Sequence, residues 1–436
     1  MCLYQSLLNK KSTIAVVGLG YVGLPLAILF AEKFNVIGFD YNFDKINLYQ
    51  RGVDPTGEVG HRVIETTKLK FTCNEEALDD CNFFVVAVPT PINEDKTPDL
   101  TPLIEASKLV GRHLTKDSIV VYESTVYPGV TEDKCIPLLE EMSHLICGKD
   151  FNVGYSPERV NPADKNHRLE TIIKIVSGCN QETTNEIANI YNEIIKVGVY
   201  KASSIKIAEA AKVIENSQRD INIAFMNEMA MILDKMNIDS KEVMKAMQTK
   251  WNALNFYPGL VGGHCIGVDP YYLIYQADQI GCPTDLLIAS RKINEKMSQY
   301  LVDRIIKYLF LANKRLDEVK IAVMGITFKE NCKDIRNSQV YKIIQRLKEF
   351  GINPLVVDPV ADYQEVKEEY QITLSNLEEV KDVDCVVFAV AHNAFKNLSI
   401  RNINKLFKKK TKKIVIDIKS IFAKEQFDHT YLYWSL

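Results

Sequence analysis

A glycine-rich stretch between residues 259 and 270 surrounds a single cysteine. It reads Gly259-Leu-Val-Gly262-Gly263-His264-Cys265-Ile-Gly267-Val-Asp269-Pro270. Glycines let a substrate approach the backbone closely and leave N–H groups near the sulfur. A cysteine thiolate is nucleophilic near neutral pH and can form a covalent intermediate. The stretch therefore favours covalent chemistry on Cys265 over the alternative of a buried, inert thiol.

A second set of polar residues lies in the segment Glu209-Ala-Ala-Lys212-Val-Ile-Glu-Asn216-Ser-Gln-Arg219. In a helix, positions i, i+4 and i+7 project from one face, so Lys212, Asn216 and Arg219 share a face. A lysine beside an amide can stabilise an oxyanion and move a proton. By itself, this pattern is also that of a hydrated helix surface.

The N-terminal part of the chain carries a nucleotide-binding pattern. Gly18-Leu-Gly20-Tyr21-Val22-Gly23 follows a β-branched run and precedes a helical one. The glycines allow a tight turn and close approach to a pyrophosphate, which the helix N-terminus favours. Asp40 ends the next strand, about 20 residues on, where a carboxylate binds a ribose 2′-OH and repels a 2′-phosphate. The pattern predicts NAD rather than NADP.

Two later strand ends fall where the cofactor crevice is expected. They are Val88-Pro89-Thr90-Pro91 and Glu123-Ser124-Thr125. Ligands in open α/β sheets bind at the carboxyl ends of the strands. Each segment can equally be a strand-terminating turn, because Pro, Ser and Thr are common in turns.

The surrounding elements predict a first α/β domain over residues 1–203. A helix is expected at Leu24–Phe34. Short apolar runs typical of buried parallel strands occur at Thr13–Gly18, Asn35–Asp40, Phe83–Val88, Ser118–Glu123 and Ile172–Ser177. They predict a doubly wound parallel sheet.

The rest of the chain predicts two further domains. One long helix is expected at Ser204–Met236, with helical segments continuing to Leu311, so residues 204–311 form a helical middle domain. Strand–helix alternation then restarts over residues 312–436, with strands at Lys320–Gly325, Pro354–Asp358, Asp384–Val390 and Lys413–Asp417. The predicted fold is α/β, with two Rossmann-like sheets joined by the helical domain.

Composition excludes several classes of protein. The 436 residues carry a net charge of -3, which does not favour a nucleic-acid partner. No run is long and apolar enough to span a membrane, and no secretory signal is apparent. The ten cysteines form no CxxC pairs, and the histidines lack metal-ligand spacing. We therefore expect a cytoplasmic protein without a bound metal.

In order along the chain, these motifs resemble the UDP-glucose/GDP-mannose dehydrogenase family. The resemblance extends over nearly the whole sequence and includes Tyr155-Ser-Pro157-Glu158-Arg159 and Gly325-Ile-Thr-Phe328-Lys329, with Asp334 and Arg336. Ser156-Pro-Glu-Arg-Val-Asn-Pro162 and Lys250-Trp251-Asn are most similar to enzymes acting on UDP-N-acetylglucosamine or UDP-N-acetylgalactosamine in surface-polysaccharide pathways. Where glucose-type relatives often have an apolar and a small residue, this chain has Arg159 and His264, which fits an N-acetyl sugar.

The resemblance implies a two-step oxidation of a sugar C6 hydroxyl to a carboxylate. Cys265 would attack the intermediate aldehyde, and the resulting thiohemiacetal would be oxidised to a thioester that water hydrolyses. Lys212 and Asn216 would stabilise the oxyanion. Asp269 and Thr125 would position Lys212 or the water, and Glu158 would assist hydrolysis.

The resemblance also implies the binding residues and a homodimer. The UDP-sugar would contact Glu158, Arg159, Val160, Lys212, Asn216, Arg219, Tyr257, Gly259, Phe328 and Lys329. NAD would contact Gly18, Gly20, Tyr21, Val22, Gly23, Asp40, Lys45, Pro89, Thr90, Ser124, Thr125 and Arg336. Residues 204–297 would form the dimer interface.

Three alternatives remain at this point. A one-step alcohol dehydrogenase would share the fold but would not need Cys265. A non-catalytic NAD or nucleotide sensor would bind ligand without turnover. Within the family, the substrate could instead be UDP-glucose, UDP-N-acetylmannosamine or GDP-mannose.

Overall fold

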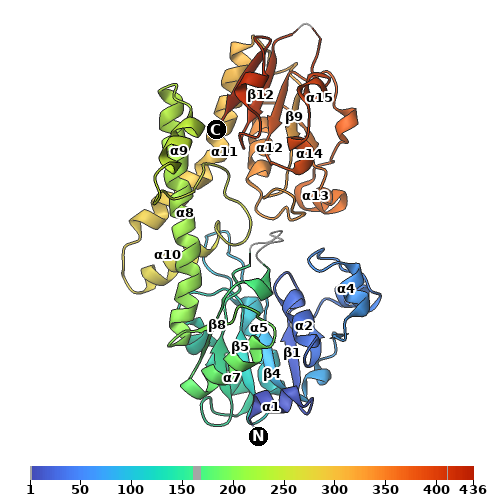
Figure 1. Cartoon of the computed structure of the whole chain (residues 1–436), viewed down its shortest axis with the longest axis vertical. Helices are drawn as coiled ribbons and strands as arrows, with labels where there is room; N and C mark the ends of the chain where they lie inside the picture. The colour runs from blue at the N-terminus through green and yellow to red at the C-terminus, as the bar shows by residue number, and fades with distance from the viewer. Residues whose placement is uncertain (1, 161–167, 410) are drawn as a thin grey trace. The chain divides into compact units, whose positions relative to one another are not determined.

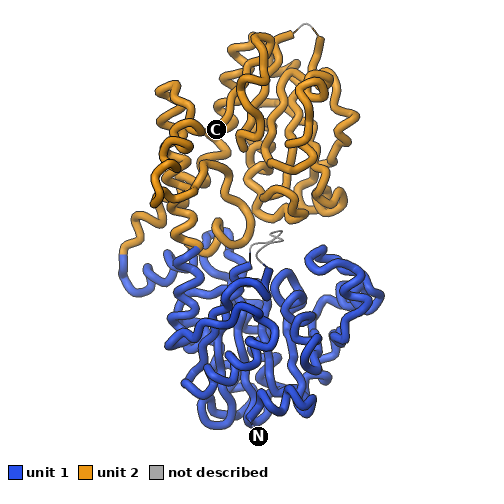
Figure 2. The backbone as a smooth tube through the Cα atoms, in the orientation of Figure 1, with its two compact units in different colours: residues 1–215, 271–282 blue, residues 216–270, 283–436 orange. Residues whose placement is uncertain are grey.

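The computed structural model describes residues 2–160, 168–409 and 411–436 (Figure 1). They divide into two compact units (Figure 2). Unit 1 comprises residues 1–215 and 271–282, and unit 2 comprises residues 216–270 and 283–436. Each unit contains one sheet. The three-domain division predicted from the sequence remains a prediction.

Unit 1 is built on an eight-stranded sheet with the order β3-β2-β1-β4-β5-β6-β7-β8. Its centre is formed by the predicted apolar runs, and the shorter strands β3, β6 and β8 were not predicted. The strands are β1 (Thr13–Val17), β2 (Asn35–Phe39), β3 (Lys70–Thr72), β4 (Cys81–Val86), β5 (Ile119–Tyr122), β6 (Asn152–Tyr155), β7 (Lys174–Gly178) and β8 (Val199–Lys201).

One strand pair corrects the prediction of a parallel sheet. The β6 and β7 strands are antiparallel, with Gly154 opposite Gly178 and Tyr155 opposite Ser177, whereas the other pairs are parallel. An apolar run indicates that a strand is buried but does not indicate its direction. The reversal brings the first residue of β7, rather than its last, to the carboxyl edge of the sheet.

In unit 1, one helix precedes the first strand, and further helices and helical turns connect the strands. They are α1 (Leu3–Leu8), α2 (Gly23–Ala31), α3 (Phe43–Gln50), α4 (His61–Thr66), η1 (Glu75–Leu78), α5 (Thr101–His113), η2 (Thr131–Cys135), α6 (Ile136–Ser143), η3 (Leu169–Thr171) and α7 (Gln181–Asn192). The predicted helix at Leu24–Phe34 is therefore shorter at its C-terminal end.

The predicted long helix is present as α8 (Ile205–Lys235), which begins in unit 1 and continues into unit 2. The other helices and turns after it are α9 (Ser240–Gln248), α10 (Asp269–Gln279), α11 (Asp285–Leu311), α12 (Gln339–Glu349), α13 (Tyr363–Tyr370), η4 (Leu377–Glu379), α14 (Asn393–Lys396), α15 (Ile400–Asn404) and η5 (Lys424–Gln426). In the part of the chain that the structure describes, no helix could span a membrane.

Unit 2 contains a five-stranded parallel sheet with the order β10-β9-β11-β12-β13. The first four strands in the sequence were predicted, and β13 was not. They are β9 (Ile321–Met324), β10 (Leu355–Val357), β11 (Cys385–Phe388), β12 (Lys413–Asp417) and β13 (Tyr431–Ser435).

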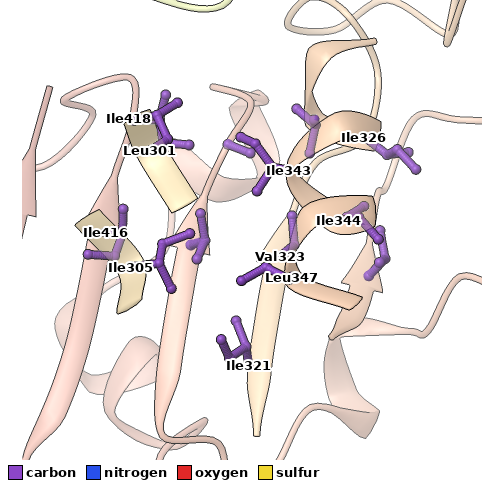
Figure 3. Close-up of a cluster of buried hydrophobic side chains, with 14 of the residues drawn as sticks. Leu301, Ile305, Ile321, Val323, Ile326, Ile343, Ile344, Leu347, Ile416 and Ile418 are labelled. Carbon is purple, nitrogen blue, oxygen red and sulfur yellow. The ribbon is translucent and has the colours of Figure 1, made fainter. Parts of the chain in front are cut away.

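The core of unit 2 explains how α11 and α12 are fixed to this sheet. Leu301 and Ile305 of α11 and Ile343 of α12 pack with Ile321 of β9 and Ile416 of β12 (Figure 3). Each of these side chains is fully buried. Burying aliphatic side chains of this size stabilises the fold by about 1.5–3 kcal/mol each.

Candidate active site

The loop between β1 and α2 has the backbone geometry that a dinucleotide pyrophosphate requires. Gly18 has a φ of +92°, and a Cβ built there would lie 2.7 Å from the Ala87 carbonyl oxygen. A Cβ on Gly23 would lie 1.8 Å from the Gly18 carbonyl oxygen. Nothing lies within 4 Å of a Cβ built on Gly20, so the backbone is open to a ligand there. The loop fits the pyrophosphate of NAD, with the N-terminus of α2 beside it.

Asp40 lies directly after β2 and is held against this loop. Its carboxylate accepts hydrogen bonds from the backbone N–H groups of Leu19, at 2.9 Å, and Asn42, at 3.0 Å. The Lys45 Nζ lies 2.5 Å from Asp40 Oδ2. A carboxylate has about four lone-pair sites, so it can also accept a ribose hydroxyl. The position therefore fits NAD.

The segments that follow β4 and β5 are connected by hydrogen bonds. The Ser124 hydroxyl donates to the Val88 carbonyl at 2.7 Å, and the Tyr155 hydroxyl donates to the Ser124 carbonyl at 3.1 Å. From α10, the Tyr272 hydroxyl donates to the Thr90 carbonyl. These contacts shape the carboxyl edge of the sheet. The predicted cofactor residues Pro89, Thr90, Ser124 and Thr125 all belong to these two segments.

Lys212 is fixed beside the end of β5. Its Nζ donates a hydrogen bond to Thr125 Oγ1, and the residue is only 7% exposed. One turn earlier on α8, the buried Glu209 accepts hydrogen bonds from the N–H groups of Gly129, at 2.6 Å, and Thr131, at 3.0 Å. Glu209 thus attaches the start of α8 to the segment after Thr125, which determines where Lys212 lies.

Glu158 follows β6 and is 9% exposed. Its Oε1 accepts hydrogen bonds from the N–H groups of Arg159, at 2.7 Å, and Val160, at 2.6 Å. Its Oε2 accepts from Lys174 Nζ at 3.2 Å. Burial alone would raise the pKa of Glu158, but the Lys174 charge, the Val160 N–H and the Lys212 charge lower it below its ordinary value. Glu158 is therefore an ionised carboxylate.

Arg159, one of the predicted sugar-binding residues, lies at the surface of unit 1. Its guanidinium is 3.3 Å from a Glu215 carboxylate oxygen and 3.5 Å from the Ile173 carbonyl. Val160 packs against the apolar core of the same unit. An exposed guanidinium next to a helix is available for polar recognition of a ligand.

In unit 2, Cys265 lies on an exposed turn that leads into α10. The Cys265 carbonyl accepts hydrogen bonds from the N–H groups of Val268, at 3.0 Å, and Asp269, at 2.8 Å. The buried Asp269 accepts a hydrogen bond from the Asn216 amide at 2.6 Å. This contact connects the cysteine turn to α8 and orients the Asn216 side chain.

The two glycines before His264 allow the turn to pack closely against the segment after β9. A Cβ on Gly262 would lie 2.8 Å from the Asn337 carbonyl oxygen, and a Cβ on Gly263 would lie 2.8 Å from the Phe328 ring. Gly263 also has a φ of +78°. Any larger residue would displace Phe328, a predicted substrate-binding residue, so these glycines are required by packing.

His264 faces an ion pair. Its Nε2 lies 3.8 Å from Asp334 Oδ2, and Arg336 forms a bidentate pair with Asp334 at 2.9 and 2.7 Å. Partial burial and the Arg336 charge lower the pKa of His264 to about 4, against the opposing effect of Asp334. The imidazole is 42% exposed and neutral near neutral pH. Arg336, predicted to lie near the cofactor, contacts Asp334 in unit 2.

A cavity of about 310 Å³, counting the open space at its mouth, lies at the carboxyl edge of the unit 2 sheet. Phe328 and Lys329 line it, as does Ser338, the N-cap of α12. Two cationic side chains and a helix N-terminus favour a phosphate. The other lining residues are Leu260, Gly262, Thr327, Glu330, Gln339, Val340, Ala389, Val390 and Lys419.

Lys419 was not among the predicted site residues. It follows β12 by two residues, at the carboxyl edge of the sheet, and lines the cavity together with Lys329. Applying the strand-end rule to the second sheet as well as the first would have identified it.

The loop that carries Gly259 is anchored to two helices. The Asn227 amide of α8 accepts a hydrogen bond from the Gly259 N–H at 2.7 Å and donates one to its carbonyl at 3.0 Å. Asn294 of α11 accepts a further bond from Asn227 at 2.8 Å. Nearby, the Tyr257 hydroxyl accepts a hydrogen bond from Gln248 at 2.5 Å. Arg219 lies on the exposed side of α8.

The predicted site residues are thus divided between the two units. Unit 1 brings together the glycine loop, Asp40, the ends of β4 and β5, Glu158 and Lys212. Unit 2 brings together the Cys265 turn, Asn216, Asp269 and the cavity beside Phe328 and Lys329. Among the described residues, no group of His, Cys, Asp and Glu has an arrangement that could hold a metal ion.

Three family models match successive parts of this chain. Residues 12–195 match the NAD binding domain of the UDP-glucose/GDP-mannose dehydrogenase family. Residues 206–296 match its central domain, and residues 322–424 match its UDP binding domain. The first match contains the glycine loop, the second contains the Cys265 turn, and the third contains most of the residues that line the cavity.

Individual relatives are similar along nearly their full length. Protein CapL of Staphylococcus aureus is 50% identical over 423 residues, covering 97% of this chain and 99% of CapL. The UDP-N-acetyl-D-glucosamine 6-dehydrogenase of Pseudomonas aeruginosa is 47% identical, covering 96% and 99%. The structure of a UDP-D-ManNAc dehydrogenase from Pyrococcus horikoshii superposes with a TM-score of 0.88 at 31% identity, covering 97% and 98%.

Proposed function

Because the chain belongs to the UDP-glucose/GDP-mannose dehydrogenase family, we propose that it oxidises the C6 hydroxyl of a UDP-N-acetylhexosamine to a carboxylate. It is an NAD-dependent nucleotide-sugar dehydrogenase. The observation that carries the finer proposal is the position of Cys265 within unit 2. The loop that lines the phosphate-favouring cavity through Leu260 and Gly262 continues directly into the exposed Cys265 turn.

The chemistry requires two oxidations and one hydrolysis. NAD, when bound, accepts two electrons as a hydride in each oxidation, so each sugar consumes two NAD molecules. Between the oxidations, the Cys265 thiolate forms a C–S bond to the C6 aldehyde carbon, and the carbonyl electrons move to oxygen. After the second oxidation, water forms a C–O bond to the thioester carbon and loses its protons to solvent. The C–S bond breaks, which gives the carboxylate and restores the Cys265 thiolate.

We assign the supporting roles to the residues that hold polar groups in fixed positions. Lys212, held by Thr125, and Asn216, held by Asp269, stabilise the oxyanions that form at C6. Lys212 also relays to solvent the proton that the C6 hydroxyl loses in the first oxidation. Glu158 assists hydrolysis as a fixed negative charge.

The substrate proposal rests on similarity and on polar residues. The relative named as a UDP-N-acetylglucosamine 6-dehydrogenase is 47% identical, whereas the UDP-D-ManNAc dehydrogenase structure is 31% identical. Arg159 and His264 add polar groups that can recognise an N-acetyl substituent. We therefore propose UDP-N-acetylglucosamine as the preferred substrate and a surface polysaccharide as the destination of its uronate.

The test measures NADH formed per sugar consumed. The purified protein is mixed with NAD and, separately, UDP-N-acetylglucosamine, UDP-N-acetylgalactosamine, UDP-N-acetylmannosamine, UDP-glucose and GDP-mannose. We expect about two NADH per sugar, as the thioester route requires, with UDP-N-acetylglucosamine preferred. About one NADH per sugar with released aldehyde would favour the one-step alternative. A preference for UDP-glucose would retain the chemistry and overturn the substrate proposal.

We further propose a homodimer formed through α8. Ile207, Ile214, Phe225 and Ile232 of this helix are exposed apolar residues. At 100° per residue, the spacings between them place all four on one face of the helix. Trp251, in the segment after α9, is 92% exposed. Exposed apolar residues that share one helix face are typical of a surface covered by a second protein chain.

A further inference from the structure

The reversed strand β7 brings an unexpected cation to the predicted hydrolysis residue. Because β6 and β7 are antiparallel, the N-terminal residue of β7 lies at the carboxyl end of β6. Tyr155, the last residue of β6, pairs with Ser177, and the Lys174 side chain contacts Glu158, three residues after the strand. In a parallel arrangement, Lys174 would instead lie at the opposite edge of the sheet, away from the ligand crevice.

The Lys174 ammonium is fully paired in the described structure. Its Nζ donates to Glu123 Oε2 at 2.6 Å, to the Pro157 carbonyl at 3.0 Å and to Glu158 Oε2 at 3.2 Å. These bonds use the three hydrogens of the ammonium. The Lys174 side chain is 1% exposed, so water does not compete with these partners.

Glu123 fixes the other side of this ammonium. It follows β5, its carboxylate is fully buried, and its Oε1 accepts a hydrogen bond from the Tyr191 hydroxyl at 2.6 Å. Tyr191 lies on α7 and is itself fully buried. Lys174 is therefore held between a carboxylate anchored by α7 and the carboxylate predicted to act in hydrolysis.

A purely structural ion pair would need only one of these carboxylates. Burying a lysine with a single glutamate balances the charge, whereas the second glutamate leaves an excess negative charge. Lys212, which lowers the pKa of Glu158 through its charge, supplies the balancing cation. Together, the charges of the four side chains alternate in sign from the interior outward. They are, in order, Glu123, Lys174, Glu158 and Lys212.

We propose that Lys174 and Glu123 are positioning residues, which hold the Glu158 carboxylate ionised and immobile so that it acts as a fixed anion. This inference rests on the proposed role of Glu158 in the second half of the reaction. It assigns functions to two residues that are not among the predicted substrate-binding and cofactor-binding residues. Both oxygens of Glu158 accept hydrogen bonds from the protein, which fixes the orientation of its carboxylate.

The pKa directions agree with this geometry. Burial raises the pKa of Glu123, against the charge of Lys174, and Glu158 raises it further. Burial would lower the pKa of Lys174, but Glu123 and Glu158 together raise it above its ordinary value. Near neutral pH, Lys174 is therefore protonated and Glu158 is ionised.

The first test replaces Lys174 with methionine, which keeps the length and removes the charge. Loss of a neighbouring opposite charge raises a carboxyl pKa by about 1–3 units, so Glu158 should take up a proton closer to neutral pH. The infrared carbonyl band of a protonated carboxylic acid, followed against pH in the full-length protein, should then gain a component that Glu158→Gln removes. In the pH profile of kcat, the fall in kcat at acidic pH should begin at a higher pH than in the wild type. KM for NAD should remain unchanged.

The second test gives a shift of opposite sign. Glu123→Gln removes a negative charge near Glu158, so that Glu158 is the one carboxylate that still pairs with Lys174. The fall in kcat at acidic pH should therefore shift to lower pH. This variant also keeps the proposal testable if Lys174→Met does not fold. Lys174→Arg keeps the positive charge and should retain the wild-type pH profile of kcat. Lys70→Met, at an exposed position on β3, is the matched control.

A fall in kcat at the same acidic pH in all variants, with activity lowered equally at every pH, would overturn the proposal and leave only a structural role. The infrared measurement needs no turnover. A wild-type yield of about one NADH per sugar would therefore reject the thioester route of the proposed function without deciding the protonation of Glu158. If adding Glu158→Gln to Lys174→Met leaves the infrared band of protonated carboxylic acids unchanged, the inference about Lys174 is rejected. The proposed function is not affected by that result.

Discussion

Cys265 differs in its surroundings from the buried cysteines of this chain. Burial raises the pKa of Cys81 and Cys135 to about 12, so their thiols remain protonated near neutral pH. Cys385 is also buried, and its pKa is raised in the same direction. Cys265 instead lies on an exposed turn beside Gly263. A nucleophilic thiolate requires this accessibility.

Cys265→Ser is expected to separate the two oxidations. The serine hydroxyl is a much weaker nucleophile, so overall turnover should fall by roughly 1000-fold or more, and the NADH yield should approach about one per sugar. NADH absorbance and product analysis by mass spectrometry measure both quantities. Cys73→Ser, at another exposed cysteine, is the control and should behave like wild type. Unchanged turnover in Cys265→Ser would support the one-step alternative.

Lys419→Met tests the cavity in unit 2. Loss of a charge-assisted hydrogen bond, about 1.5–3 kcal/mol, should raise KM for the nucleotide sugar roughly tenfold or more and leave kcat near the wild-type value. Steady-state kinetics at saturating NAD give both constants. Lys424→Met, on the exposed η5 turn, is the control. An equal loss in kcat with unchanged KM would place Lys419 outside the binding site.

At the scale of elements, a buried imidazole fixes the loop that carries Phe328 and Lys329. The Asn331 N–H donates to His392 Nδ1 at 2.9 Å, so this nitrogen carries no hydrogen. His392 Nε2 therefore carries the hydrogen and donates to Asp358 Oδ2 at 3.1 Å. Asp358 also accepts hydrogen bonds from the N–H groups at the start of the loop. The loop is held at both ends by one buried pair.

His392→Ala is expected to loosen this loop. It leaves buried polar groups unsatisfied, which costs about 1–3 kcal/mol each, so Tm should fall and UDP affinity should drop roughly tenfold. Differential scanning fluorimetry and isothermal titration with UDP measure the two effects. NAD affinity should be unaffected, because the NAD-binding residues of unit 1 are unchanged. His429→Ala, at an exposed histidine, is the control, and equal UDP affinity in both variants would contradict the assignment.

The pattern of elements was largely predictable, because buried strands have a distinctive composition. Thr13–Val17 and Ile321–Met324 are short, apolar and β-branched, and both form central strands. The shorter strands β3, β6 and β8 lack this signal. Strand β6, Asn152–Tyr155, contains a glycine and polar residues, and its pairing with β7 is determined by neighbours distant in the sequence.

At the scale of the whole molecule, the exposed stripe on α8 predicts the assembly state. Phe225→Asp places a charge in the stripe and should shift the proposed dimer toward the monomer, because an unpaired charge in an apolar interface is costly. Analytical ultracentrifugation over a range of concentrations measures this shift. Phe310→Asp, at an exposed position on α11, is the control. A wild-type protein that sediments as a monomer would reject the dimer.

The sequence by itself determined the parts of the function that local patterns encode. The glycine spacing of Gly18–Gly23, the carboxylate at Asp40 and the glycines around Cys265 each specify a backbone geometry or a reactive group within a short segment. Such patterns are readable because turn and strand preferences depend on neighbouring residues. They were sufficient for the fold class, the cofactor and the family.

Only the tertiary structure decided which distant residues act together. Lys174 belongs to an ordinary apolar run, and nothing local indicates that it meets Glu123 and Glu158. That meeting depends on the direction of β7, which hydrophobic periodicity does not encode. Likewise, Lys419 joins the cavity only because parallel strands bring their carboxyl ends to one edge of the sheet. A long-range pairing sets the position of each of these charges, so the fold had to be known before their roles could be proposed.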